Sequence, residues 1–220
     1  TILGSEAGVW LTEGDNNTLA GYNAGGDLTT GGGNVAIGYL ALDNEDTSSF
    51  NVAIGTQALS TQDASVDAYN VAVGHNAGLA VTTGTNNTIV GGLAGDALTT
   101  GVRNVAIGKG ALSTEDTGSY NVAIGESALT DQNVDDAYNV AVGYHSGLSV
   151  TTGVQNTLIG ALAGDAITIG RFNTALGYQS LSENILTDRN TALGYGTLAS
   201  LVGDGSTNNQ ATYNVAIGHN

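Results

Sequence analysis

Short stretches with the same order of polar and apolar residues recur along the whole chain. Each consists of an Asn, a β-branched residue, a small or apolar residue, an aliphatic residue and a Gly, as in residues 34–38. Because side chains of a β-strand point alternately to opposite faces, Val35 and Ile37 share one face, and Asn34, Ala36 and Gly38 share the other. Both faces are apolar or small, which is typical of a strand that is covered on both sides.

The stretches are spaced almost evenly. They begin at Asn17, Asn34, Asn51, Asn70, Asn87, Asn104, Asn121, Asn139, Asn156, Asn173, Asn190 and Asn214. A near-constant period, here about 17 residues, is the signature of a repeat architecture. A unit of this length is too short to bury its own core and must stack on its neighbours. The spacing therefore predicts an all-β protein, a parallel β-roll or β-solenoid of about 13 coils and a length of about 60 Å.

A second apolar segment follows each of these stretches, as in Ala41-Leu42 and Ala111-Leu112. A Thr-Thr-Gly sequence or an acidic stretch then turns the chain back towards the next Asn. We therefore expect two short strands in each coil. No break in composition divides the chain, so residues 1–220 are expected to form one continuous module, and its mid-unit end suggests a fragment of a longer array.

The coils are grouped in fours. In the first coil of each group the third residue of the stretch is bulky (Leu19, Ile89 and Leu158), whereas elsewhere it is mostly Ala. A thin rod encloses little volume for its surface, a condition under which small folds need help from oligomerisation or metals. We therefore predict a homotrimer in which the small face packs against other copies. The predicted interface residues are Ala36, Ala53, Ala72, Ala106 and Ala123.

Composition narrows the function further. The chain has 4 Lys and Arg against 20 Asp and Glu, for a formal net charge of -16, which disfavours binding to nucleic acid. It has no Cys, which excludes disulfides and thiolate metal sites. No apolar run approaches the roughly 18 to 20 residues of a membrane helix, so this segment is not expected to insert into a membrane.

Most candidate residues have a structural interpretation. The twelve repeated Asn are predicted to form a hydrogen-bonded ladder from coil to coil, and the Gly four residues later to have a positive φ or to allow close approach of another backbone. The acidic return loops, for example Asp43 to Asp46 and Asp131 to Asp136, are interpreted as solvated surface. A Ca²⁺ bound by these carboxylates is the alternative, and no resident cofactor or metal is otherwise expected.

Two places are candidates for recognition. The coil from Asn190 to Asn214 is longer than the rest, and insertions in solenoids map to loops on one face, often the binding face. Leu201, Asp204 and Asn208 lie in this insertion, and Tyr178 and Tyr195 lie on the repeat face beside it. No acid and base pair, nucleophile or phosphate loop is distinguished, so no catalytic residue is predicted and the chain is not expected to be an enzyme.

The motif Asn-Val-Ala-Ile-Gly-x-x-Ala, with Thr-Thr-Gly before the next Asn, resembles the head repeat of trimeric autotransporter adhesins, the YadA-like head. Residues 173–181, Asn-Thr-Ala-Leu-Gly-Tyr-Gln-Ser-Leu, are similar to the repeat arrays of phage tail fibres and bacterial surface proteins that end in an endosialidase-type chaperone domain. The resemblance covers essentially the whole chain. It implies a left-handed parallel β-roll, three chains side by side, and an extracellular, cell-surface or virion location.

We therefore expect a structural and adhesive module of a trimeric fibre that mediates attachment to a host or surface, with a cell-surface glycan or protein as receptor. A calcium-dependent surface-filament or matrix module is the main alternative. An ice-binding solenoid is less favoured, because such a protein needs a flat array of Thr. The Thr pairs of this chain are too sparse to cover a face, and they lie at 29–30, 82–83, 99–100 and 151–152. A glycan-degrading tailspike is a further alternative. Neither a viral nor a bacterial parent is favoured.

Overall fold

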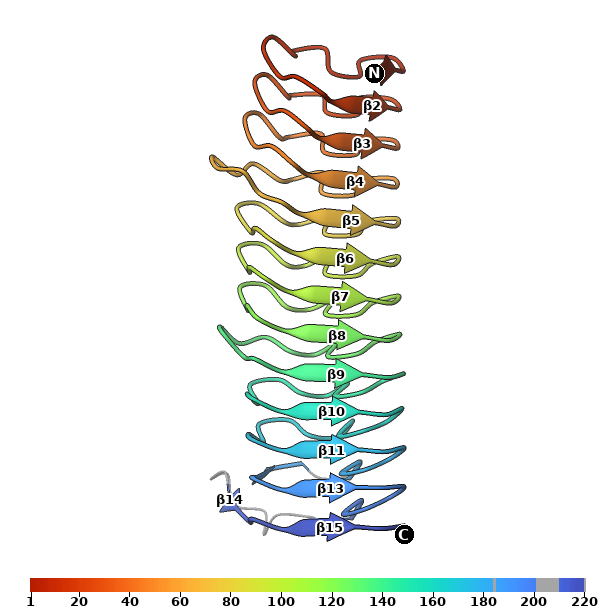
Figure 1. Ribbon diagram of the computed structural model, residues 1–220, viewed down its shortest axis with the longest axis vertical. Coiled ribbons are helices and arrows are strands. Elements are labelled where there is room, and N and C mark those ends of the chain that lie inside the picture. The colour runs from red at the N-terminus through yellow and green to blue at the C-terminus, as the bar shows by residue number, and fades with distance from the viewer. Residues whose placement is uncertain (184, 201–209, 220) are drawn as a thin grey trace.

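The computed structural model describes residues 1–183, 185–200 and 210–219, and these form a straight rod of stacked coils (Figure 1). Thirteen parallel strands form one sheet and follow each other in chain order. They are β1 (Ile2–Leu3), β2 (Thr18–Ala20), β3 (Val35–Ile37), β4 (Val52–Ile54), β5 (Val71–Val73), β6 (Thr88–Val90), β7 (Val105–Ile107), β8 (Val122–Ile124), β9 (Val140–Val142), β10 (Thr157–Ile159), β11 (Thr174–Leu176), β13 (Thr191–Leu193) and β15 (Val215–Ile217). The predicted all-β parallel solenoid is confirmed.

Equivalent residues of successive coils lie directly above one another. Ala36 of β3 pairs with Ala53 of β4, and Ala106 of β7 pairs with Ala123 of β8. Backbone hydrogen bonds run from coil to coil, and the amide of Val35 donates to the carbonyl of Asn51 at 2.8 Å. A near-constant coil length is what allows every residue to keep this register.

The expectation of two strands in each coil is wrong. The second apolar segment is a series of turns in every described coil, and Leu42 and Leu59 have φ values of 52° and 49°. A left-handed backbone cannot continue a strand, because strands require φ well below zero. Among the described residues one additional pair of strands is present, β12 (Thr187–Asp188) with β14 (Gln210–Ala211), and β14 belongs to the longest coil.

The core is a single thin layer inside the coil. The middle residue of each three-residue strand points inward, and Ala36 faces a wall that carries the buried Leu42. In the first coil of a group the inward strand residue is large and the residue opposite it is Gly. A Cβ on Gly25, for example, would lie 2.9 Å from the Leu19 Cδ2 atom. Leu19, Ile89 and Leu158 therefore fill the inside of the chain opposite glycines.

Candidate functional site

The repeated asparagines form a buried column through the rod. Asn104 illustrates the geometry: its Oδ1 accepts the backbone N–H of Asn121 at 2.9 Å, and its Nδ2 donates to the carbonyl of Gly118 at 2.8 Å. Each side chain thus connects its own coil to the next one. Most of these bonds join a side chain to the backbone, and direct bonds between two Asn side chains begin at Asn156, which donates to Asn139 at 3.2 Å. From Asn34 to Asn190 these side chains are at most 1% exposed, and only the Nδ2 of Asn121 among them has no hydrogen-bond partner, so we interpret the column as structural.

Replacing Asn104 by Ala should destabilise the rod by about 2 to 6 kcal/mol per chain, because two buried backbone groups lose their partners at about 1 to 3 kcal/mol each. Urea unfolding followed by circular dichroism measures this loss. The exposed Asp131→Ala variant is the control and should lie within about 0.5 kcal/mol of the parent. Equal effects of the two substitutions would contradict a structural column.

The outward side chains of the strands form a mostly apolar surface, with Thr at five places, that we call the outer ribbon. Its two rows are the first and third residues of strands β2 to β11, β13 and β15, and every one is exposed or partly exposed. The first row is Thr18, Val35, Val52, Val71, Thr88, Val105, Val122, Val140, Thr157, Thr174, Thr191 and Val215. The second row is Ala20, Ile37, Ile54, Val73, Val90, Ile107, Ile124, Val142, Ile159, Leu176, Leu193 and Ile217. These rows follow the sheet along its whole length.

The predicted trimer interface is wrong, because its five alanines lie inside the chain and not on the outer ribbon. Ala36, Ala53, Ala72, Ala106 and Ala123 are at most 1% exposed in a single chain, because they point into its own core. Their side chains cannot meet another copy. Alternation in a strand divides the residues into two faces but does not say which face points inward, and here both faces are apolar. The thin coil accepts Ala inside and leaves Val and Ile outside.

Aromatic residues after the strand glycines stack along the rod. Tyr22 stacks on Tyr39 with ring centroids 5.6 Å apart, and Tyr178 stacks on Tyr195 at 5.4 Å. Tyr195 is also covered by His219, at 4.8 Å. The structure therefore brings the candidates Tyr178 and Tyr195 together, but both faces of Tyr195 are occupied by other rings. Neither face of the Tyr195 ring is therefore free for a sugar to stack on.

A second column contains planar side chains immediately before the ladder asparagines. Its residues other than Gly have φ between 50° at Tyr213 and 64° at Phe50. Phe50 stacks on Tyr69 at 5.1 Å, and the guanidinium of Arg189 lies 4.8 Å from Phe172 and 5.6 Å from Tyr213. A left-handed conformation costs about 1 to 2 kcal/mol for such residues, and stacking offsets this by about 0.5 to 1.5 kcal/mol per pair. We interpret this column as structural.

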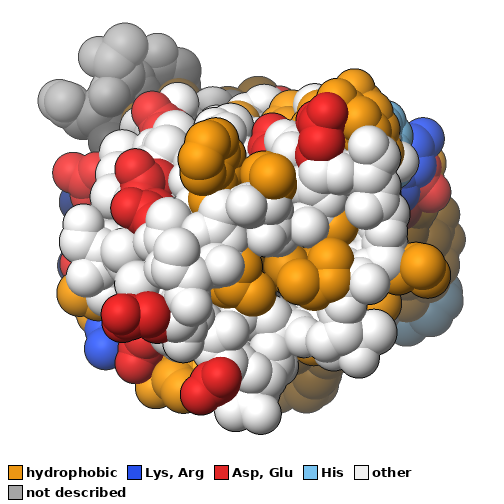
Figure 2. All heavy atoms as spheres, turned by 90° about the horizontal axis from the view of Figure 1, so that it is seen from above, with side chains coloured by type: hydrophobic (Ala, Val, Ile, Leu, Met, Phe, Trp, Pro, Cys, Tyr) orange, Lys and Arg blue, Asp and Glu red, His pale blue; other side chains and the backbone are white. Residues whose placement is uncertain are grey.

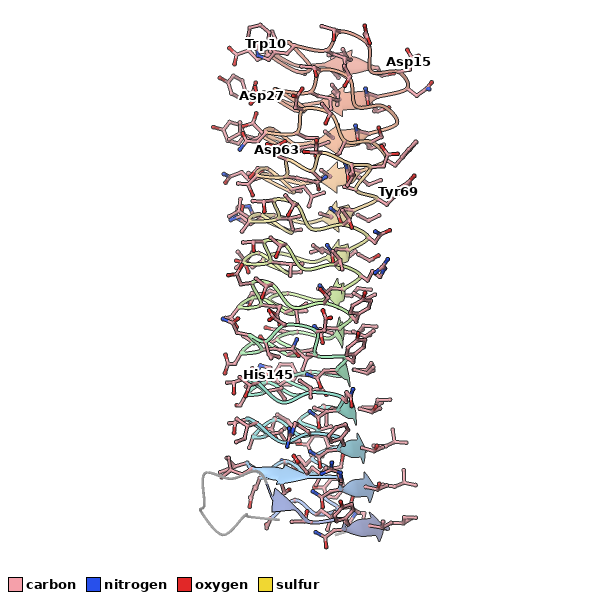
Figure 3. The ribbon with its side chains drawn as sticks, turned by 90° about the vertical axis from the view of Figure 1, so that its left-hand side faces the viewer. Trp10, Asp15, Asp27, Asp63, Tyr69 and His145 are labelled. Atoms are coloured by element: carbon pink, nitrogen blue, oxygen red, sulfur yellow. The ribbon has the colours of Figure 1, made fainter. Side chains whose placement is uncertain are left out.

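The two aromatic columns lie on different sides of the rod. Figure 3 shows Trp10 and His145 at one edge and Asp15 and Tyr69 at the opposite edge. His145 is stacked on Tyr144 with centroids 3.8 Å apart.

Of the described residues, no group of three or more His, Cys, Asp or Glu is close enough together to hold a metal ion.

The long coil from Asn190 is one of three equivalent insertions. The steps from Asn51 to Asn70, from Asn121 to Asn139 and from Asn190 to Asn214 are 19, 18 and 24 positions, and each begins at the third coil of a group of four. The loops between β4 and β5 and between β8 and β9 project beyond the other loops on the same side of the rod (Figure 1). The longest coil is therefore not unique, and the regular spacing of the two smaller insertions is visible in the sequence.

The base of the longest insertion is firmly anchored. Asp188 is 1% exposed and accepts the backbone N–H of Arg171 at 2.6 Å. Its other oxygen lies 3.2 Å from the Arg171 guanidinium and 3.7 Å from that of Arg189. The candidates Leu201, Asp204 and Asn208 lie outside the described residues. Strand β14 pairs in parallel with β12 of the preceding coil, so the chain is stacked on that coil again from Gln210.

Acidic side chains do not all lie in solvent as we expected. Asp46, Asp63 and Asp67 are exposed, and seen along the axis many carboxylates lie around the rim (Figure 2). Glu45 and Glu115, however, are fully buried. Burial raises the pKa of Glu115 above its ordinary value of 4.5, although N–H groups that donate to it, including those of Gln132 and Gly118, oppose this shift. The interpretation of these two glutamates as solvated surface is wrong.

Three aspartates occupy one partly buried column, five residues after a strand Gly. Burial raises the pKa of Asp43, Asp96 and Asp165 above the ordinary 3.8, and in Asp43 the nearby Asp27 adds to the shift. Within the described chain the Oδ1 atoms of Asp96 and Asp165 are buried and accept no hydrogen bond. Their ionised forms are therefore poorly stabilised.

Stability should consequently fall as pH rises. Below the unfolded pKa both states are protonated. Above it the unfolded carboxylates ionise freely while the folded ones resist, so the folded state loses stability until its own raised pKa is passed. We expect the urea midpoint to be higher near about pH 4 than near about pH 8, and the Asp96→Asn, Asp165→Asn double variant to reduce this difference. A parent midpoint that rises with pH would contradict the shifts.

Comparison of the chain with protein-family models, with curated proteins and with solved structures found no match in any of the three. Among the described residues there is also no helix with the length and apolar character needed to cross a membrane.

Proposed function

We propose that the chain is a structural segment of a homotrimeric fibre, located outside the cell, on a cell surface or on a virion, and that the fibre serves attachment to a host or surface. The observation that carries this proposal is the outer ribbon. It is continuous along the sheet, and its second row includes Ile37, Leu176 and Leu193, which are 38%, 44% and 40% exposed.

The size of the outer ribbon argues for a covered surface. Twelve strands spaced about 4.8 Å apart give a length of about 58 Å, and the two rows are about 7 Å apart, so the ribbon covers about 400 Å². This lies within the range of about 300 to 600 Å² that is usual for the largest apolar patch on a monomer, and such patches are often functional. A partner with the same straight shape and the same period covers it best, and another copy of this chain has both properties.

Three copies are supported by the resemblance to adhesin head repeats, in which three rods lie side by side. Light scattering in solution tests this stoichiometry directly. The expected mass is about three times the 21.9 kDa of one chain. A monomer at micromolar concentration would contradict self-association through the ribbon, and a dimer would retain the interface but contradict the trimer.

For attachment, the insertions of the third coils are the best candidates, because loops can vary without disturbing the coils beneath them. Deleting seven residues between 201 and 212 shortens that coil to the usual repeat length and should leave the trimer folded. We expect binding to target cells or to immobilised glycans to be lost. A matched Tyr178→Ala, Tyr195→Ala variant should retain binding, and the opposite outcome would assign recognition to the repeat face.

A further inference from the structure

One column of the core contains polar side chains at regular places. It consists of the residue eleven positions after each ladder Asn, and all its described members up to residue 167 are fully buried. In the first and fourth coils of a group this residue is aliphatic, as in Leu98 and Val150. In the second and third coils of the first two groups it is a Glu followed by a Gln: Glu45 with Gln62, and again Glu115 with Gln132. An apolar column is thus interrupted twice by the same polar pair.

The hydrogen bonds of the two pairs are the same. The Glu115 Oε1 atom accepts the backbone N–H of Gly118 at 2.8 Å, and Oε2 accepts the Nε2 of Gln132 at 2.8 Å. Gln132 in turn accepts the Nδ2 of Asn139 at 2.8 Å. The chain of bonds therefore runs across three successive coils. Each group along it is matched as donor to acceptor.

The bonds from Glu45 follow the same order. Its oxygens accept the backbone N–H of Ser48 at 2.8 Å and the Nε2 of Gln62 at 3.0 Å, and Gln62 accepts from Asn70 at 3.0 Å. The same buried three-coil connection is thus present at the same place in the first two groups of coils, whereas the sequence of the third group has Asn184 and Leu201 at the two positions. Both copies also hold the stem of a third-coil insertion, since Gln62 and Gln132 directly precede Asp63 and Asn133.

Most other contacts do not distinguish one coil from the next. Strands β3, β4, β7 and β8 have the same sequence, and β5 and β9 differ from them by one methylene. If the coil from Asn121 to Tyr138 looped out, β9 could pair with β7 and Asn139 could replace Asn121 in the ladder. Glu115 would then lie against Val150 with no amide to donate to it. Its Oε1 would keep the N–H of Gly118, but its Oε2 would be buried without a partner, which penalises this register.

We infer that each Glu-Gln-Asn connection is a register key, which fixes the order in which otherwise interchangeable coils stack and prevents the third coil of a group from being skipped. This role concerns folding and does not depend on the proposed trimer or on attachment. An apolar pair in the same place would fill the core equally well, but it would pack as favourably on the fourth coil as on the third.

Engineered disulfides can report the register, because the chain contains no Cys. Lys109, Glu126 and Tyr144 are exposed and occupy one column of three successive coils. A Lys109→Cys, Glu126→Cys pair spans adjacent coils, about 4.8 Å apart, and should close in the native register. A Lys109→Cys, Tyr144→Cys pair spans about 9.6 Å and can close only when the intervening coil is skipped.

The test combines these pairs with changes in the key and measures cross-linking after oxidative refolding. In the Glu115→Leu, Gln132→Leu variant we expect the 109–144 cross-link to rise at least about tenfold over the parent. Leu98→Val, a core change in the same column that retains the key, should leave it at the parental level. A folded apolar variant with no rise in the 109–144 cross-link would overturn the inference.

A swapped key keeps the test decisive if the apolar variant fails to fold. In Glu115→Gln, Gln132→Glu every donor again faces an acceptor, whereas Gln132→Glu alone places two carboxyls together. The single variant should lower the thermal midpoint by about 10 °C, and the swap should recover most of this loss with parental cross-linking. A swap as unstable or as slipped as the single variant would show that pairing between these coils does not set the register.

Discussion

Replacing Gly91 by alanine is expected to lower the free energy of unfolding by about 3 to 5 kcal/mol, which lowers the thermal midpoint by about 10 °C for a chain of this size. Gly91 directly follows β6 and has a φ of 135°, a conformation that L side chains rarely adopt. A Cβ there would lie 2.5 Å from the carbonyl oxygen of Gly108 in the next coil. The obstacle is backbone, so relief requires the coils to move apart.

The next residue provides a matched control. A Cβ on Gly92 would meet nothing closer than the carbonyl oxygen of His75, 4.0 Å away. Gly92→Ala should therefore be neutral or slightly stabilising, because Ala restricts the unfolded chain more than Gly does. Differential scanning calorimetry of the two variants separates them. Similar midpoints for both would mean that close approach between coils does not determine the strand Gly.

The repeat itself made the architecture predictable. A short pattern that returns at a near-constant interval leaves few arrangements other than stacked coils, and the register of β7 on β8 follows from equal spacing. The roles of Asn and Gly also followed from chemistry, since a buried amide requires partners and a positive φ favours Gly. These features are local, and each coil carries the same information.

Features that depend on the shape of the coil could not be predicted in the same way. The alternation of Val35, Ala36 and Ile37 gave two apolar faces, and the choice of the inner one depends on how closely the two walls of a coil approach. Leu42 shows the difference most clearly, because it was expected in a second strand but lies in a left-handed turn. The wall that it forms is close enough to leave room only for Ala36.

The buried glutamates were missed for another reason. Glu45 and Glu115 lie in acidic stretches, and a charged residue next to other charges is normally solvated. Only alignment of the coils shows that they occupy the same column as Leu98 and Val150. The same alignment places the insertions in third coils. A comparison between coils, rather than along the chain, therefore contains information that local pattern reading does not use.

Introducing a charge into the outer ribbon should have the largest effect on assembly. Ile107→Asp points outward from β7, so the single chain keeps its core, but in the proposed trimer three carboxylates would meet near one axis at a cost of several kcal/mol each. We expect the mass measured by light scattering to fall from about three times 21.9 kDa to that of one chain. Far-UV circular dichroism should remain that of a β-solenoid.

Two matched substitutions show whether the loss of the trimer depends on the side of the strand to which the new carboxylate points. Ala106→Asp is the adjacent residue and points inward, so it should unfold the single chain by burying an unpaired charge in the core. Lys109→Asp introduces the same group on a side chain that is 73% exposed and lies off the ribbon, and it should change neither mass nor fold. If Ile107→Asp remains a trimer, the copies associate through another surface, and the outer ribbon is covered by something other than this chain.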